Sequence, residues 1–181
     1  EAGGDPRADL EAAVAAFAEA LRLNPNDYGA TVSLSNALLY LGADARARGG
    51  QAAAHFRAAI QAARQATELE GNLVGAWVNL GIAHGQLAAI LRDSGGDPAT
   101  DMAAGVAALE RAIEVNPRFL TAHFNLAELL LQEAQGKLRR GRDPTAEVAR
   151  AHQLLAPVHE ANTSWAAPHF LAARTRRRTG Q

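Results

Sequence analysis

A spacing of 46 residues relates four short segments of this chain. "GATVSL" begins at residue 29, "GAWVNL" at 75, "TAHFNL" at 121 and "APHFLA" at 167. The segments between them agree at a multiple of that offset, because "ALRLNP" ends at Pro25 and "AIEVNP" ends at Pro117. Repeats of this length are typical of arrays in which each unit buries its apolar face against the next one. The spacing therefore predicts one continuous array over residues 1–181.

Each period predicts two α-helices. Apolar residues recur at three- and four-residue steps, as in Leu10, Val14, Phe17 and Leu21. Much of the 48% hydrophobic content is alanine and only 5% of residues are aromatic, a composition that favours helices over a β-sandwich or barrel. The expected first helices of the repeats cover 28–41, 73–92, 119–139 and 164–178, and the expected second helices cover 6–23, 51–69, 98–115 and 144–160.

About eight helices follow from this pattern. They divide into the second helix of a truncated repeat at 1–27, three repeats at 28–72, 73–118 and 119–163, and a terminal helix at 164–181. Both ends of the array are open, which leaves self-association through them as an alternative.

An acidic loop, "DSGGDPATD" at 93–101, raises the question of a metal site. Its copies "RRGRDPTAE" and "ARGGQAAAH" lack most of the carboxylates, and the spacing is not that of a calcium loop. What recurs is glycine, then a short polar residue, then usually proline. Glycine ends a helix at positive φ, aspartate caps the next helix, and proline suits its first turn. The loop is therefore predicted to end one helix and start the next, and not to bind a metal.

The repeat unit resembles the tetratricopeptide repeat. "AWVNLGIAH" carries the W-x-x-L-G pattern of that family's first helix, and Ala13, Phe17, Ala20 and Pro25 match its second helix. The resemblance implies an all-α, right-handed superhelical solenoid of antiparallel helix pairs. The family repeats every 34 residues, so each unit here has extra residues between its two helices, and the long apolar pattern after Leu126 favours longer helices over longer loops.

The resemblance also implies that the first helices line a concave groove that binds a peptide. An apolar row runs along these helices, with amides and charges beside it, although neighbouring helices could cover part of the row. Lysine and arginine are missing from these positions in the first three repeats, which disfavours a clamp for a C-terminal carboxylate. The candidate groove residues are Val32, Asn36, Tyr40, Val78, Asn79, Ile82, Gln86, Phe124, Asn125, Glu128, Gln132 and Phe170.

No enzyme is expected. The chain has no cysteine, no glycine-rich phosphate loop and no serine in a nucleophile motif, and it implies no cofactor. His123 and His169 stand at the repeat position of Trp77, which favours a packing role for both. The expected function is therefore a protein–protein interaction scaffold.

Two alternatives stay open. Repeats of similar length look like those that follow kinase domains in bacterial Ser/Thr protein kinases, so the chain could be the docking region of a larger enzyme. Residues 137–181 hold 9 basic and 3 acidic residues, against 9 and 16 in residues 1–136. Such a basic end could bind nucleic acid or an acidic protein partner, or could simply be solvated. The aromatic residues that mark single-strand binding are missing there. With no signal peptide and no apolar run expected to cross a membrane, a cytoplasmic protein is expected.

Overall fold

The computed structural model describes residues 6–161. This range forms seven α-helices and no strand. The predicted terminal helix, with Phe170 and His169, lies outside the described residues. The helices are α1 (Pro6–Leu23), α2 (Tyr28–Ala47), α3 (Ala52–Leu69), α4 (Val74–Asp93), α5 (Ala99–Val115), α6 (Leu120–Arg139) and α7 (Thr145–Ala161).

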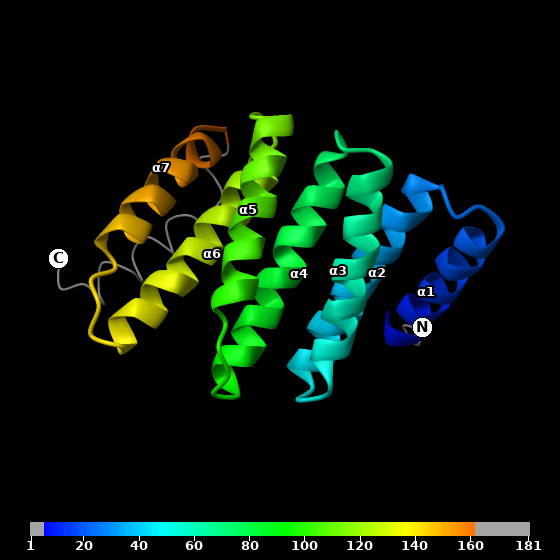
Figure 1. Cartoon of the computed structure of the whole chain (residues 1–181), viewed down its shortest axis with the longest axis horizontal. Helices are drawn as coiled ribbons and strands as arrows, with labels where there is room; N and C mark the ends of the chain where they lie inside the picture. Colours follow the sequence, from blue (N-terminus) through cyan, green and yellow to red (C-terminus); the bar gives the residue numbers. More distant parts are fainter. Residues whose placement is uncertain (1–5, 162–181) are drawn as a thin grey trace, which may run out of the picture.

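The helices form a two-layered array in chain order (Figure 1). Each helix packs on the next one along the chain, as expected for helices joined by short turns. In addition α2 contacts α4, and α4 contacts α6. We call α2, α4 and α6 the inner layer and the other helices the outer layer. The predicted pairing of first and second helices in a solenoid is confirmed.

The extra residues of each repeat lengthen the helices. All three inner helices have 20 residues, while the turn from α2 to α3 occupies only residues 48–51. The predicted end of α2 at residue 41 was wrong, because α2 continues to Ala47. Gly42 does not end the helix. It lies inside α2, where an added Cβ would come within 2.6 Å of the Phe56 ring, so its small size permits α3 to approach closely.

Glycines end the three inner helices. Gly49, Gly95 and Gly141 have φ of 71°, 78° and 67°. The residue after each one donates its backbone N–H to a carbonyl five residues earlier, for example Gly96 to Leu91 at 2.8 Å. This is the Schellman arrangement that satisfies carbonyls at a helix end. The predicted helix-terminating role of these glycines is confirmed.

The three carboxylates of "DSGGDPATD" have three different partners. Oδ1 of Asp97 accepts the backbone N–H of Ala99 at 3.0 Å, Asp93 pairs with Arg46, and Asp101 pairs with a histidine of α4. Within residues 6–161 no three histidine, aspartate or glutamate side chains gather around a common point. The loop therefore serves to stop one helix, start the next and tie both to their neighbours.

Trp77 and His123 make equivalent contacts in successive repeats. Nε1 of Trp77 donates to the carbonyl oxygen of Gly71 at 2.8 Å. Nε2 of His123 lies 2.9 Å from the carbonyl oxygen of Pro117. Each ring thus ties the start of an inner helix to the turn before it. The predicted packing role of His123 at the helix–helix contact stays a prediction; the structure shows that it shares the turn contact of Trp77.

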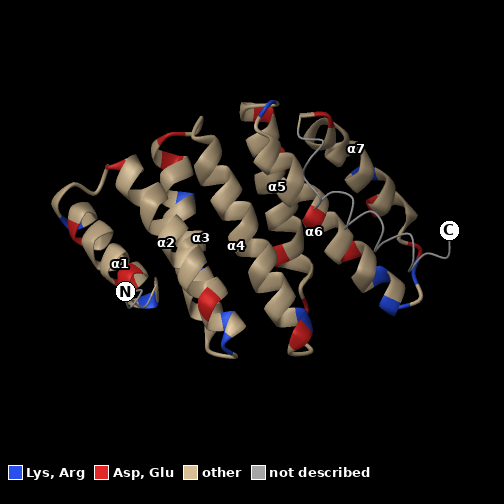
Figure 2. Cartoon of the chain, turned by 180° about the vertical axis from the view of Figure 1, so that it is seen from behind, with Lys and Arg blue, Asp and Glu red and all other residues tan. Residues whose placement is uncertain are grey.

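Helix α4 is central to the core. Its only charged residues are Arg92 and Asp93 at its end, and charges elsewhere also lie mostly at helix ends and turns (Figure 2). By length and composition α4 could cross a membrane, so the expectation that no segment could do so was wrong. In the array 61% of this apolar window is buried. Such burial is expected for a helix that contacts neighbours in both layers, as α4 does with α2, α3, α5 and α6.

Candidate functional site

The candidate site is the exposed surface of the inner layer, which we call the inner face. It is most open over α2, where Asn36 is exposed and Tyr40 is 59% exposed. At the corresponding positions of α4 and α6, Ile82, Gln86 and Glu128 are only partly exposed. The side chains of the inner face are therefore most exposed at Tyr40 on α2 and become less exposed towards α4 and α6.

The predicted apolar row is largely a part of the core. Val78 is 5% exposed and belongs to the core cluster that α4 forms with α5, α6 and α7, so its assignment to the groove was wrong. Phe124 is half-buried and packs against the same cluster. Val32 is also half-buried. Neighbouring helices cover α4 from both sides, which is why the middle member of the row is the most buried one.

The two predicted amides differ in their contacts. Nδ2 of Asn79 donates to Oγ of Ser35 at 2.8 Å and lies 3.5 Å from the carbonyl oxygen of Val32. It therefore joins α4 to α2, and its N–H groups are directed to the protein itself. Nδ2 of Asn125 donates at 2.7 Å to the carbonyl oxygen of Thr121, one turn earlier on α6. Neither donor is aimed at an approaching ligand backbone in this arrangement.

A small polar pocket of about 30 Å³ lies between α4 and α6. It has room for one water molecule, which needs about 10–15 Å³. Burial raises the pKa of the Glu128 carboxyl, and Oε1 of Gln132 is buried without a hydrogen-bond partner in the described part of the chain. The polar residues that line this pocket are Gln86, Asn125, Glu128 and Gln132.

Gln86 connects this pocket to the end of α2. Its Oε1 accepts a hydrogen bond from Nη1 of Arg46 at 2.8 Å, and Nη2 of the same arginine donates to Asp93 at 3.1 Å. The predicted residues thus form two groups. Asn36 and Tyr40 offer an exposed surface on α2, whereas Gln86, Asn125, Glu128 and Gln132 surround a narrow polar recess. The link through Arg46 was not predicted. The available signal was that Arg92 occupies the same position one repeat later.

The inner face presents an exposed aromatic ring and a recess with hydrogen-bonding groups. Its one recessed carboxyl, Glu128, has neither a nucleophile nor a second acid beside it among the residues that line the pocket. Tyr40 offers a large aromatic surface with a polar end, which is a common combination at protein interfaces. Side chains of this kind suit the binding of a polypeptide.

Solved structures show the fold of this chain. A crystal structure of MamA superimposes with a TM-score of 0.60 at 18% identity, over 97% of this chain and 81% of that chain. A thermophilic TPR protein of Thermus thermophilus, TTC0263, superimposes with a TM-score of 0.54 at 21% identity, over 86% of this chain and 74% of that chain. The chain has a tetratricopeptide-repeat-like fold. A MamA RS-1 ArsTM double mutant matches as well, with a TM-score of 0.54 at 17% identity, over 81% and 66% of the two chains.

Sequence comparisons add nothing to this result, because no protein-family model and no curated protein matches the chain. At these identities the similarity establishes the helical solenoid. The residues that bind a partner have to be inferred from the surface of this chain itself.

Proposed function

We propose that the chain is a protein–protein interaction scaffold that binds a peptide segment across its inner face. The observation that carries the proposal is the pair Asn36 and Tyr40, exposed together on α2 in an otherwise well-packed layer. An aromatic ring that is 59% exposed leaves a large apolar area in water, and its burial by a partner would be favourable by about 25 cal/mol per Å².

The chemistry of the inner face favours a mixed ligand. Tyr40 would contact an apolar side chain, while Asn36 would hydrogen-bond to the main chain of the same segment. Further along, Gln86 and Glu128 present polar atoms at the edge of the narrow recess. We therefore infer a segment with one apolar anchor followed by polar or basic residues, bound at the α2 end of the array.

Selection from a random peptide library displayed on phage, with the intact chain as bait, tests this proposal. Selected peptides are then measured by fluorescence anisotropy against the double variant Asn36→Ala/Tyr40→Ala. We expect a loss of affinity of about tenfold or more, as for removal of an aromatic interface anchor. Both positions are exposed, so the variant should unfold at the same urea concentration as the original chain.

A matched control removes an exposed apolar side chain elsewhere. Leu23, the last residue of α1 in the outer layer, is 71% exposed. The Leu23→Ala variant should bind the selected peptides as the original chain does. If the affinity for the selected peptides fell equally in Asn36→Ala/Tyr40→Ala and Leu23→Ala, or fell in neither, the inner face over α2 would be ruled out as the binding surface.

A further inference from the structure

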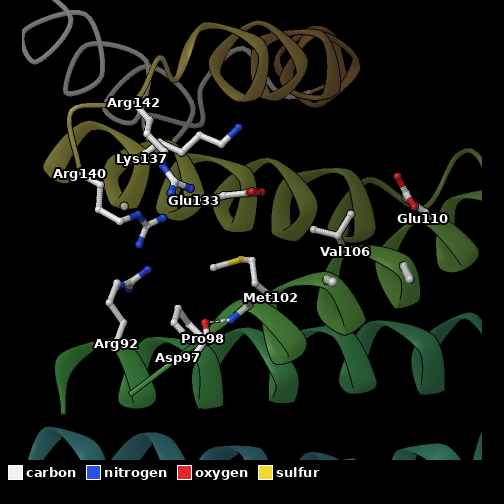
Figure 3. A pocket seen from close by; sticks show the side chains of 14 residues that line it. Arg92, Asp97, Pro98, Met102, Val106, Glu110, Glu133, Lys137, Arg140 and Arg142 are labelled. Carbon is white, nitrogen blue, oxygen red and sulfur yellow. Dashed lines mark hydrogen bonds between the residues drawn. The ribbon is translucent and has the colours of Figure 1, made fainter. Parts of the chain in front are cut away.

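A second surface lies at the edge of the array where the helix turns of two successive repeats meet. A pocket of about 630 Å³ opens there between α5 and the end of α6 (Figure 3). Pro98, Met102 and Val106 form an apolar wall on the α5 side. The basic residues Arg92, Lys137, Arg140 and Arg142 line the same pocket. We call this site the turn-edge pocket. Its basic residues belong to the ends of α4 and α6 and to the turn after α6, and its apolar wall belongs to Pro98 and the first half of α5, away from the exposed pair on α2.

The preceding repeat provides an internal comparison. A pocket of about 450 Å³ lies one repeat earlier, between the end of α2 and the end of α4. There Arg46 donates to Asp93 at 3.1 Å and to Gln86 at 2.8 Å. The cation of this earlier junction therefore has both a carboxylate and an amide oxygen as partners.

Beside the turn-edge pocket, a cation stands at the repeat position of that carboxylate, and its charge acts on Arg92 although its side chain does not line the pocket. Arg92 occupies the repeat position of Arg46, but Arg139 occupies the position of Asp93 and Arg140 that of Ser94. Nη1 of Arg92 reaches only the backbone carbonyl of Gln132, at 3.5 Å, and its Nε is buried without a hydrogen-bond partner. The same arginine that is paired in one repeat is thus left with an unsatisfied donor in the next.

The acids that line this pocket have other partners or make no direct ion pair with these arginines. Glu110 pairs with Arg150, Glu147 pairs with Lys137 at 2.5 Å, and Asp97 caps α5. Glu133 also lines the pocket. The hydrogen bond to Glu147 raises the pKa of Lys137, and the charge of Glu133 adds a smaller contribution. Within residues 6–161, Arg92, Arg139, Arg140 and Arg142 make no ion pair at 4.0 Å or less.

The electrostatic consequence is visible at Arg92. Burial lowers the pKa of its guanidinium; the charge of Asp93 opposes this change, and the charges of Arg139, Arg46 and Arg140 reinforce it. Like charges held together at a partly buried position favour the binding of an anion, because an anion would satisfy the donors and cancel the repulsion.

We propose that the turn-edge pocket binds an oxyanion carried by an acidic peptide segment, in the role that Asp93 fills at the preceding junction. A peptide fits better than a free ion, because the pocket is far larger than a carboxylate or phosphate group and one wall of it is apolar. A peptide also fits better than nucleic acid, because none of the residues that line it is aromatic. The site takes an acidic side chain, or a phosphorylated one, next to an apolar residue.

The test uses the whole chain and a fluorescein-labelled polyglutamate peptide with one central leucine, measured by anisotropy at low ionic strength. The double variant Arg139→Asp/Arg140→Ser gives the later junction the residues of the earlier one. It should lower the affinity for the peptide by about tenfold or more. Because the new carboxylate can pair with Arg92, the variant should melt at the same temperature as the original chain or higher, which separates lost binding from lost folding.

A matched control makes the same change of charge on another surface. Arg57 and Arg64 are exposed on α3 and do not line the turn-edge pocket. The variant Arg57→Asp/Arg64→Ser should bind the peptide as the original chain does. An equal loss of affinity in the two variants would mean that net charge alone attracts the peptide, and would overturn the proposal.

Further probes identify the anion. A peptide with phosphoserine in place of glutamate that binds more tightly assigns the site to phosphate, and one that binds equally or less tightly assigns it to carboxylate. Failure of both peptides to bind, or tighter binding of single-stranded oligouridine that Arg139→Asp/Arg140→Ser abolishes, would overturn the proposal. The Asn36→Ala/Tyr40→Ala variant should bind the acidic peptide normally, so the outcome is independent of the inner face.

Discussion

His84 of α4 and Asp101 of α5 approach to 2.7 Å between Nδ1 and Oδ1. Their side chains are only 11% and 19% exposed, so this contact lies largely inside the interface between the two helices of one repeat. Asp101 also lies in the first turn of α5, where the helix dipole favours a negative charge. The pair therefore fixes the register of α5 against α4.

Replacement of Asp101 by alanine should lower the free energy of unfolding by about 1–3 kcal/mol, because the buried imidazole would lose its acceptor. Asp101→Asn retains an oxygen that can accept from Nδ1 and should cost less. Urea denaturation of both variants measures the difference. Equal stability of the alanine variant and the original chain would show that water replaces the carboxylate at no cost.

Asp97→Ala should lower the free energy of unfolding by about 1 kcal/mol, as for loss of a helix cap. Its carboxylate accepts the backbone N–H of Ala99, a role that needs no metal. Thermal melts with and without added Ca²⁺ measure both effects, and the calcium should change neither protein. A calcium-dependent rise in melting temperature that is lost in the variant would reinstate the acidic loop as a ligand.

Helix α4 also packs unusually closely on α5 at Gly81. A Cβ on this residue would come within 2.4 Å of Cγ of Leu109 and 3.0 Å of the carbonyl oxygen of Gly105. Gly81→Ala should therefore destabilise the chain by about 1–3 kcal/mol through overpacking. Gly75, on the same helix, has its nearest neighbour at 4.0 Å, so Gly75→Ala should be neutral or stabilising by up to about 1 kcal/mol. Chemical denaturation measures the stability of both variants. If Gly81→Ala were the more stable of the two, α5 would be able to move away from α4 without cost.

The turns were predictable from sequence because their chemistry is local. A positive-φ glycine at Gly95 and a capping carboxylate at Asp97 act within a few residues, and internal copies showed which features recur. The start of α2 followed for the same reason, because the Asp27 side chain accepts the backbone N–H of Ala30. The end of α2 did not, because the use of Gly42 for close packing depends on Phe56 of another helix.

The candidate groove was less predictable because burial depends on neighbours. Successive four-residue steps on a helix rotate by about 40° each, so a row that starts at Val32 turns from the helix interface towards solvent by Tyr40. The corresponding residues after Val78, Ile82 and Gln86, are less exposed because α4 has inner-layer neighbours on both sides. The change from Asp93 to Arg139 was visible in the aligned repeats. The sequence did not show that this change removes an ion-pair partner, because the ion pair between Arg46 and Asp93 is seen only in the structure.

Glu128 gives the inner face a pH dependence. Burial raises the pKa of its carboxyl above the ordinary 4.5, so the folded chain disfavours the ionised form. Stability from this group is greatest below about pH 4.5 and declines as the pH rises from that value through the pKa of the folded state. Glu128→Gln removes the charge and should therefore stabilise the chain at pH 7, with a gain that disappears as the pH falls below 4.5. Urea denaturation of both proteins across this range measures the effect, with Glu68→Gln on the exposed side of α3 as a control that should show no such gain. A glutamine variant that is less stable than the original chain at pH 7 would mean that the ionised carboxylate of Glu128 contributes to the fold.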